Sequence, residues 1–170
     1  MKNKIVQLSL VVISLLSLSI SIYLLSQQKK IAFFDYNKVY NECNLKKELE
    51  VDLERVVSSR KSDLDSMQME LSFLSNKIKS GNSSKEELSI FEELKHRYLS
   101  FQDKYENENL RIKEQYFMQI RSDINEQSKL FSKEMDYNYF FSATGDGSLM
   151  HAKESEDVTN EFLEYINKNK

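Results

Sequence analysis

Few side chains in this 170-residue chain have the types and the spacing that chemistry requires. The two histidines, His96 and His151, have no cysteine or carboxylate partners at the spacing of a metal site. Asp146 lies between two glycines, which is more typical of a hairpin turn than of a catalytic loop. No glycine-rich phosphate loop of the GxxxxGK[ST] type occurs. We therefore predict no enzyme activity, no metal site and no cofactor.

The remaining reactive or charged groups also have simple structural explanations. Cys43 is the single cysteine, so it cannot form an internal disulfide, and we interpret it as a small, semi-buried residue. The acidic pairs at 86–87 and 92–93 are typical of a solvated helix surface. A net charge of −3 and a pI of about 5.6 give no signature of a nucleic-acid binder. The chain is therefore expected to bind no nucleic acid.

Long helices account for most of the chain. Proline is absent and only three glycines occur, which removes the commonest helix breaker. Apolar residues recur in steps of three and four through residues 44–80 and again from 85 to about 135, with an interruption at Arg60. This spacing buries one helix against the other. The sequence therefore predicts an antiparallel helical hairpin, an arm over residues 44–135.

Several independent signals place the tip of this arm at residues 80–84. Gly81 can adopt the left-handed conformation that ends a helix. Lys77 and Lys79 precede it and suit the negative end of the helix dipole. A capping box for the second helix can form in two ways, from Ser83 with Glu86 or from Ser84 with Glu87.

The segments on either side of the arm predict a small α+β body over residues 31–43 and 136–170. Residues 31–36 are β-branched and aromatic and indicate a strand that is apolar on both faces. Asn37 is expected to cap a short helix that ends at Glu42, and Asn44 to cap the first long helix.

After the arm the pattern changes from helical to extended. Residues 137–143 and 148–152 predict two strands that form a hairpin around the turn at 145–147. Asp157 is expected to cap a final helix. Such a sheet has open edges that need pairing or cover, so we expect several copies to join their strands. The apolar face of the final helix would consist of Val158, Phe162, Tyr165 and Ile166.

The N-terminal residues indicate export. Residues 1–4 are basic, residues 5–25 carry no charge and residues 26–30 form a linker. A bilayer core needs about 20 apolar residues, so 5–25 can span it. We favour an uncleaved signal anchor, with a cleaved signal peptide and a buried soluble helix as alternatives. Residues 31–170 would then lie on the periplasmic side of the inner membrane, or free in the periplasm after cleavage.

The order of these elements resembles the OmpH/Skp family of periplasmic chaperones. The resemblance is carried by residues 30–42, 139–143, 148–152 and 157–162, and it covers about residues 30–168. It implies a homotrimer in which strands of three chains form a small barrel and three arms surround a cavity. Family members hold unfolded outer-membrane proteins in that cavity without ATP. This chain departs from the strongly basic soluble members because it is mildly acidic.

This resemblance makes unfolded envelope proteins the expected partners. Apolar residues off the main seam would provide weak and adaptable contacts to them, although the same residues could instead pack within the arm. The alternative function is a non-enzymatic coiled-coil spacer or interaction protein of the envelope. The candidate client-binding residues are Met69, Phe73, Leu99, Leu110, Tyr116 and Met118, and the candidate residues of the trimer body are Ile31, Phe33, Phe140, Leu149 and Phe162.

Overall fold

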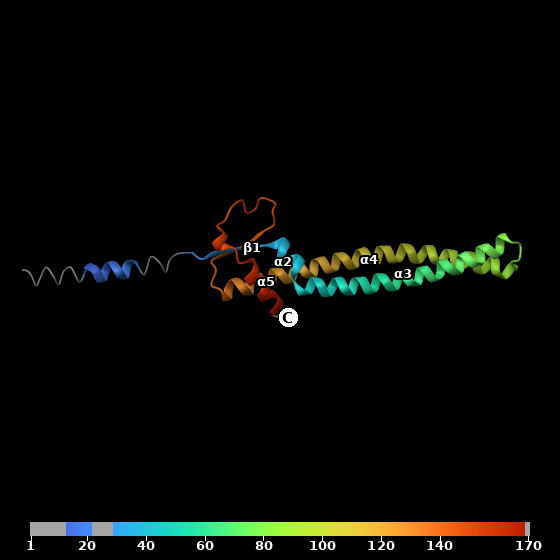
Figure 1. The fold of residues 1–170 in the computed structure, drawn as a ribbon, viewed down its shortest axis with the longest axis horizontal. Coiled ribbons are helices and arrows are strands. Elements are labelled where there is room, and N and C mark those ends of the chain that lie inside the picture. Colours follow the sequence, from blue (N-terminus) through green and yellow to red (C-terminus); the bar gives the residue numbers. More distant parts are fainter. Residues whose placement is uncertain (1–12, 22–28, 169–170) are drawn as a thin grey trace, which may run out of the picture.

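The computed structural model describes residues 13–21 and 29–168, and its long axis follows two paired helices (Figure 1). A small body lies at one end of these helices, and their connecting turn lies at the other (Figure 1). The fold is mostly helical with a two-stranded sheet. Its elements are β1 (Ile31–Asp35), α2 (Tyr36–Glu42), α3 (Asn44–Lys79), α4 (Lys85–Glu134), β2 (Tyr139–Ala143), a 3₁₀ turn (Glu154–Glu156) and α5 (Thr159–Lys168).

The helices α3 and α4 form the antiparallel arm that the apolar spacing predicts (Figure 1). Their ends differ from the predicted ends by a single residue each. Leu74 of α3 and Leu94 of α4 are buried against the opposite helix. The step of three or four residues between apolar positions therefore predicts correctly that the two helices pair.

The tip follows the predicted chemistry. Gly81 has a φ of +73°, in the left-handed region that favours glycine. Its N–H donates to the carbonyl of Ile78 at 3.1 Å, and the N–H of Asn82 donates to the carbonyl of Lys77 at 3.2 Å. These two bonds are those of a Schellman motif, and they satisfy carbonyls that the end of α3 would otherwise leave unpaired.

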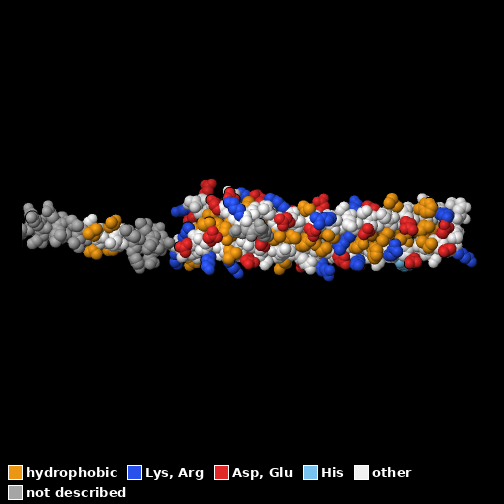
Figure 2. All heavy atoms as spheres, turned by 90° about the horizontal axis from the view of Figure 1, so that it is seen from below, with side chains coloured by type: hydrophobic (Ala, Val, Ile, Leu, Met, Phe, Trp, Pro, Cys, Tyr) orange, Lys and Arg blue, Asp and Glu red, His pale blue; other side chains and the backbone are white. Residues whose placement is uncertain are grey.

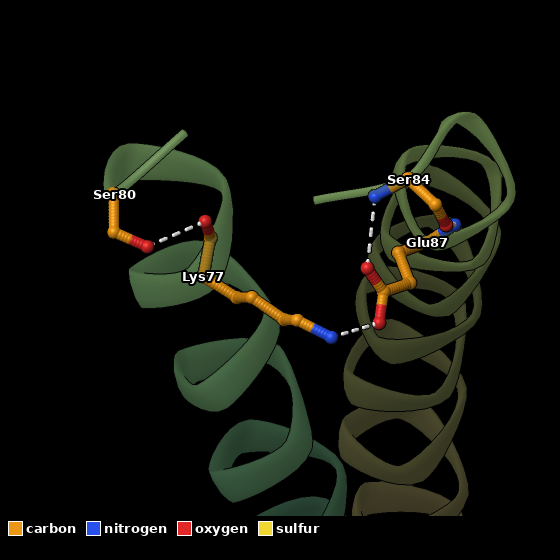
Figure 3. Close-up of polar contacts among 4 residues, drawn as sticks. All are labelled: Lys77, Ser80, Ser84 and Glu87. Atoms are coloured by element: carbon orange, nitrogen blue, oxygen red, sulfur yellow. Dashed lines mark hydrogen bonds and ion pairs between the residues drawn. The ribbon is translucent and has the colours of Figure 1, made fainter. Parts of the chain in front are cut away.

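Of the two possible capping boxes, the structure forms the one with Ser84 and Glu87 (Figure 3). The N–H of Glu87 donates to Ser84 Oγ at 3.1 Å, and the N–H of Ser84 donates to Glu87 Oε2 at 2.9 Å. Two free donors at the start of α4 thereby gain acceptors.

The two strands are parallel, with Ile31 opposite Tyr139 and Asp35 opposite Ala143. The unequal helix lengths explain this arrangement, because α4 has 14 more residues than α3 (50 against 36). At about 1.5 Å per residue the excess is about 21 Å, which exceeds the roughly 17 Å of a five-residue strand. Helix α4 therefore extends through the body to the side where β1 begins, and β2 starts beside the beginning of β1.

The predicted third strand, residues 148–152, is wrong. The segment is irregular, and β2 pairs with β1 instead of with a following hairpin partner. Gly145 and Gly147 both have positive φ, and Asp146 Oδ1 accepts the N–H of Ser148 at 2.9 Å. This local turn directs the chain away from the sheet, and within the described residues only the bridge between Phe33 and Asp157 extends β1 on its other side.

Two of the predicted helix caps are also wrong. Asp35, and not Asn37, caps α2 by accepting the N–H of Lys38 at 3.0 Å. Asn44 lies inside α3, and its N–H donates to Asn167 Oδ1 of α5 at 2.8 Å. In both cases the extended residue comes one or two positions earlier than the asparagine. The cap of α2 is local, whereas the acceptor for the Asn44 N–H comes from α5, which the sequence alone does not show.

The body encloses an aromatic core. Phe131 of α4 and Phe162 of α5 have ring centroids 5.2 Å apart, and Phe34 of β1 lies 4.7 Å from Phe162. The predicted apolar face of α5 is confirmed, because Phe162 and Ile166 are buried and its other two members pack against them. The buried cluster consists of Phe34, Val39, Cys43, Ile120, Ile124, Phe131, Phe162 and Ile166.

The predicted membrane segment lies mostly outside the described residues. Only 13–21 of its residues are described, and these are helical. No helix within 13–21 and 29–168 combines the length and the apolar character needed to cross a bilayer. The chain enters the body at Lys30, whose N–H donates to Asn138 Oδ1 at 2.7 Å and whose carbonyl accepts the N–H of Asn138 at 2.8 Å.

Candidate functional site

Polar contacts hold the middle of the arm. The guanidinium of Arg60 contacts Glu108 Oε2 at 2.6 Å, donates to Asn109 Oδ1 and lies over the ring of Tyr105 at 5.2 Å. Arg60 is the residue that interrupts the apolar spacing of α3, and residues 107–109 interrupt that of α4. The two interruptions therefore meet, so that the half-buried cation has an anion and an amide beside it.

A second polar contact lies nearer to the body. Tyr116 of α4 donates from its hydroxyl to Asp52 Oδ2 of α3 at 2.5 Å. This hydrogen bond raises the pKa of Tyr116 above its ordinary value, because the bond favours the protonated phenol. Tyr116 was predicted to contact client proteins, but its hydroxyl links the two helices of the arm.

A third contact closes the tip. Lys77 of α3 forms an ion pair with Glu87 of α4, which is also the residue of the capping box (Figure 3). The hydrogen bond from Lys77, followed by that from Ser84, lowers the pKa of the Glu87 carboxyl. The ionised form of Glu87 is therefore part of the tip structure.

The other predicted client-binding residues are exposed. Met69 and Phe73 lie on α3 with 68% and 67% of their surface accessible, and Leu99, Leu110 and Met118 of α4 are more than half exposed. They do not gather at one place but are distributed along the arm. The arm of a single chain thus leaves large apolar side chains in contact with solvent.

One apolar stripe on α4 was not recognised from the sequence as a unit. We call Leu88, Leu99, Leu110 and Phe117 the α4 stripe. Its members are 43–59% exposed and are seven or eleven residues apart, which places them on one face of a helix. Leu88 and Phe117 also fit the three- and four-residue spacing that predicts the seam. Along α4 the same spacing continues into the buried residues Ile124 and Phe131, so this face enters the body core.

The predicted residues of the trimer body divide into two groups. Phe140 and Phe162 pack within the core of one chain, with ring centroids 5.4 Å apart. Ile31, Phe33 and Leu149 are exposed or half-buried. The register places Ile31 beside Tyr139 and Phe33 beside Phe141 on the sheet surface away from the core. We call these four residues the outer sheet face.

The structure also places the other residues that were considered for chemistry. Cys43 is buried, and no group of three or more potential metal ligands occurs within residues 13–21 and 29–168. His96 and His151 are exposed. Hydrogen bonding from Ser148 and Thr144 lowers the pKa of Asp146 to about 2, as expected for a turn carboxylate.

Comparisons with known proteins agree with this architecture. A family model described as outer membrane protein (OmpH-like) matches residues 30–166. A solved structure of an OmpH-like protein from Caulobacter crescentus CB15, provisionally named an outer membrane chaperone, has a similar fold with a TM-score of 0.60. The two chains are 8% identical, and the match covers 84% of this chain and 86% of the other. No curated protein matches the chain.

Proposed function

Because the chain belongs to the OmpH-like family of outer membrane proteins, we propose that it is a holdase chaperone of the cell envelope. It would bind unfolded outer-membrane or other envelope proteins between helical arms and would need no ATP. The family and the structural relative support a chaperone role in general. The mode of holding and the class of client are our proposal.

The observation that carries this proposal is the exposed apolar surface of the arm. The α4 stripe, together with Met69 and Phe73, gives large apolar side chains that neither helix covers. Figure 2 shows hydrophobic side chains along the length of the arm, among charges of both signs. Such a surface suits many weak contacts to a chain without a fixed structure, because no single contact dictates the partner's shape.

We propose that three copies assemble through the body. The outer sheet face is apolar and exposed, and the rings of Tyr139 and Phe141 are stacked with centroids 6.1 Å apart. The opposite face of the sheet packs on the body core through Ala32 and Phe34, so the outer sheet face is the apolar face that a neighbouring chain would cover. Assembly would bring three arms together and create a cavity between them.

We propose a periplasmic location, which is the location that the family implies. Residues 5–25 would hold the chaperone at the inner membrane as an uncleaved anchor. If they are removed as a signal peptide, the protein would be free in the periplasm.

The test is an aggregation assay with the full chain and an unfolded β-barrel protein, without nucleotide. We expect near-stoichiometric trimer to keep the client soluble, as measured by light scattering. Replacing Leu88, Leu99 and Leu110 together with Gln should weaken holding at least fivefold and leave the helical content unchanged. Unchanged aggregation beside properly assembled protein would refute the holdase function, and a stable complex with one folded partner would favour the spacer alternative.

A further inference from the structure

A small cavity lies where the arm meets the body. It lies between α2, α3 and α4 and has a volume of about 170 Å³. An apolar cavity of about 150 Å³ is large enough to hold a benzene ring. We propose that this shoulder cavity binds one aromatic ring, supplied during holding by a Phe or Tyr side chain of the client. Its apolar walls are Tyr40, Leu49, Leu53, Tyr116, Phe117 and Ile120.

Three of the polar residues around the shoulder cavity, Lys46, Glu50 and Tyr116, already have polar partners. Lys46 Nζ lies 3.0 Å from Glu50 Oε1 and donates to Asn41 Oδ1 at 3.1 Å. The hydroxyl of Tyr116 donates to Asp52 at 2.5 Å. A polar ligand would lose its hydration without gaining hydrogen bonds from these groups, whereas an apolar ring has nothing to lose. The cavity is therefore matched to an aromatic ring rather than to a neutral polar ligand.

The walls also offer the geometry that aromatic rings prefer. The rings of Tyr40 and Phe117 have centroids 5.9 Å apart and are inclined at 58°. Aromatic pairs favour such tilted arrangements at separations of 4.5–7 Å. Because the Tyr40 ring already contacts Tyr36 and the Lys46 cation, the partly exposed ring of Phe117 is the one against which a third ring can pack. Lys113, the remaining charged residue of the lining, can place its cation over the ring of the ligand.

The position of the cavity connects it to the proposed client surface. Phe117 is both a wall of the cavity and the last exposed member of the α4 stripe, before this face enters the body at Ile124. A client chain that lies along the stripe therefore reaches the cavity at the root of the arm. One ring inserted there gives a single deep contact within an otherwise shallow surface, as buried anchors do in other interfaces.

Ring binding can be tested on the full chain with fluorobenzene and ¹⁹F NMR. Leu53→Phe places a ring inside the cavity, while the matched control Val51→Phe adds the same ring on the exposed side of α3, where Val51 is 58% exposed. We expect saturable binding by the wild type and the control, and at least tenfold weaker binding by Leu53→Phe. No saturable binding by the wild type, or equal binding by Leu53→Phe, would overturn the proposal.

A second variant protects this test against misfolding of Leu53→Phe. Leu53→Ala enlarges the shoulder cavity, so the larger ligand 5-fluoroindole should gain at least threefold in affinity relative to fluorobenzene. An unchanged preference between the two ligands would contradict a site at this position, whatever Leu53→Phe does. Circular dichroism and light scattering would show whether each variant keeps its helices and its assembly.

The identity of the occupant rests on the proposed holdase function, and a pair of clients separates the two claims. One unfolded client carries Phe and Tyr at its apolar positions, and the other carries Leu and Val at the same positions. Leu53→Phe should hold the aromatic client several-fold less well and the aliphatic client as well as the wild type does. If the wild type binds fluorobenzene but holds neither client, the holdase function fails and the ring site stands. If it holds both clients but binds no ring, the holdase function stands and the ring site fails.

Discussion

The body and the arm are both rich in apolar residues, but they use them differently. In the body, the rings of Phe34, Phe131, Phe140 and Phe162 contact one another at 4.7–5.4 Å within one chain. In the arm, Leu74 and Leu94 are the buried residues of the stretch 44–119, all of which the structure describes. The body is therefore stabilised by burial, and the arm by a thin seam, polar contacts and caps. An arm of this kind keeps apolar surface available.

We expect the free energy of unfolding to fall most for a substitution in the body. Phe131→Ala removes a ring with 1% of its surface exposed and should lower the free energy of unfolding by about 3–5 kcal/mol. Phe73→Ala in the arm, where the ring is exposed, should change it by less than about 0.5 kcal/mol. Urea denaturation followed by far-UV circular dichroism measures both. Equal effects would remove the distinction between the two regions.

The middle of the arm should respond to charge rather than to volume. Glu108→Ala leaves the half-buried guanidinium of Arg60 without its anion and should destabilise the arm by about 1–2 kcal/mol. Replacing both partners, Arg60→Met together with Glu108→Leu, leaves neither charge unpaired and should be neutral within about 1 kcal/mol. Hydrogen exchange of amides near residue 60 measures the local effect. A larger loss for the double variant than for Glu108→Ala would mean that the ion pair itself stabilises the seam.

At the tip a single cap should be measurable. Ser84→Ala removes the acceptor for the N–H of Glu87 and should cost about 1 kcal/mol, confined to the first turn of α4. Ser83→Ala is the matched control, because the capping box uses Ser84. Amide exchange in residues 85–88 is the measurement. Similar changes for both variants would show that the box seen here does not form in solution.

The contribution of Glu87 to the stability of the tip should depend on pH, and this is the weakest of the four changes that we expect. The folded pKa of Glu87 lies below its ordinary value of 4.5, so its contribution is present above pH 4.5 and declines as the pH falls through the lowered pKa. Lys77→Met removes the largest cause of the shift and should move the pKa back up towards 4.5. An NMR titration of the Glu87 carboxyl gives both values. An unchanged pKa would assign the shift to the backbone cap instead.

The arm was predictable because its signals are local. The three- and four-residue spacing, Gly81 and the serine caps act through neighbours within a few positions, and each was found in the sequence. The sheet was not predictable in the same way, because its pairing depends on the 14-residue excess of α4, a property of the whole fold. The predicted cap Asn44 was wrong for a related reason, since the acceptor of its N–H, Asn167, comes from a distant element, whereas Asn37 was wrong because Asp35, two positions earlier, forms the cap.

The candidate site was only partly predictable. Exposed residues such as Met69 and Phe73 could be separated from the seam by counting helical positions. Leu88 and Phe117 could not, because both also satisfy the three- and four-residue spacing of a buried face. The shoulder cavity depends on how α2 packs against the arm, and no sequence pattern reports the space that remains between packed side chains.

The parallel pairing of β1 with β2 also dictates an order of events when the chain folds. Lys30 contacts Asn138, which lies 108 positions further along the chain, so the body cannot close until most of the polypeptide is available. The helical hairpin of the arm forms from contacts between residues that flank its turn, so it can fold outward from the tip before residues 136–170 are available. Once the hairpin has formed, it holds the two strands close together and so lowers the entropic cost of pairing them. Phe34 and Val39 are synthesised early, but their packing partners in the body core are synthesised last. We therefore expect a partly synthesised chain to have a folded arm and an unfolded body.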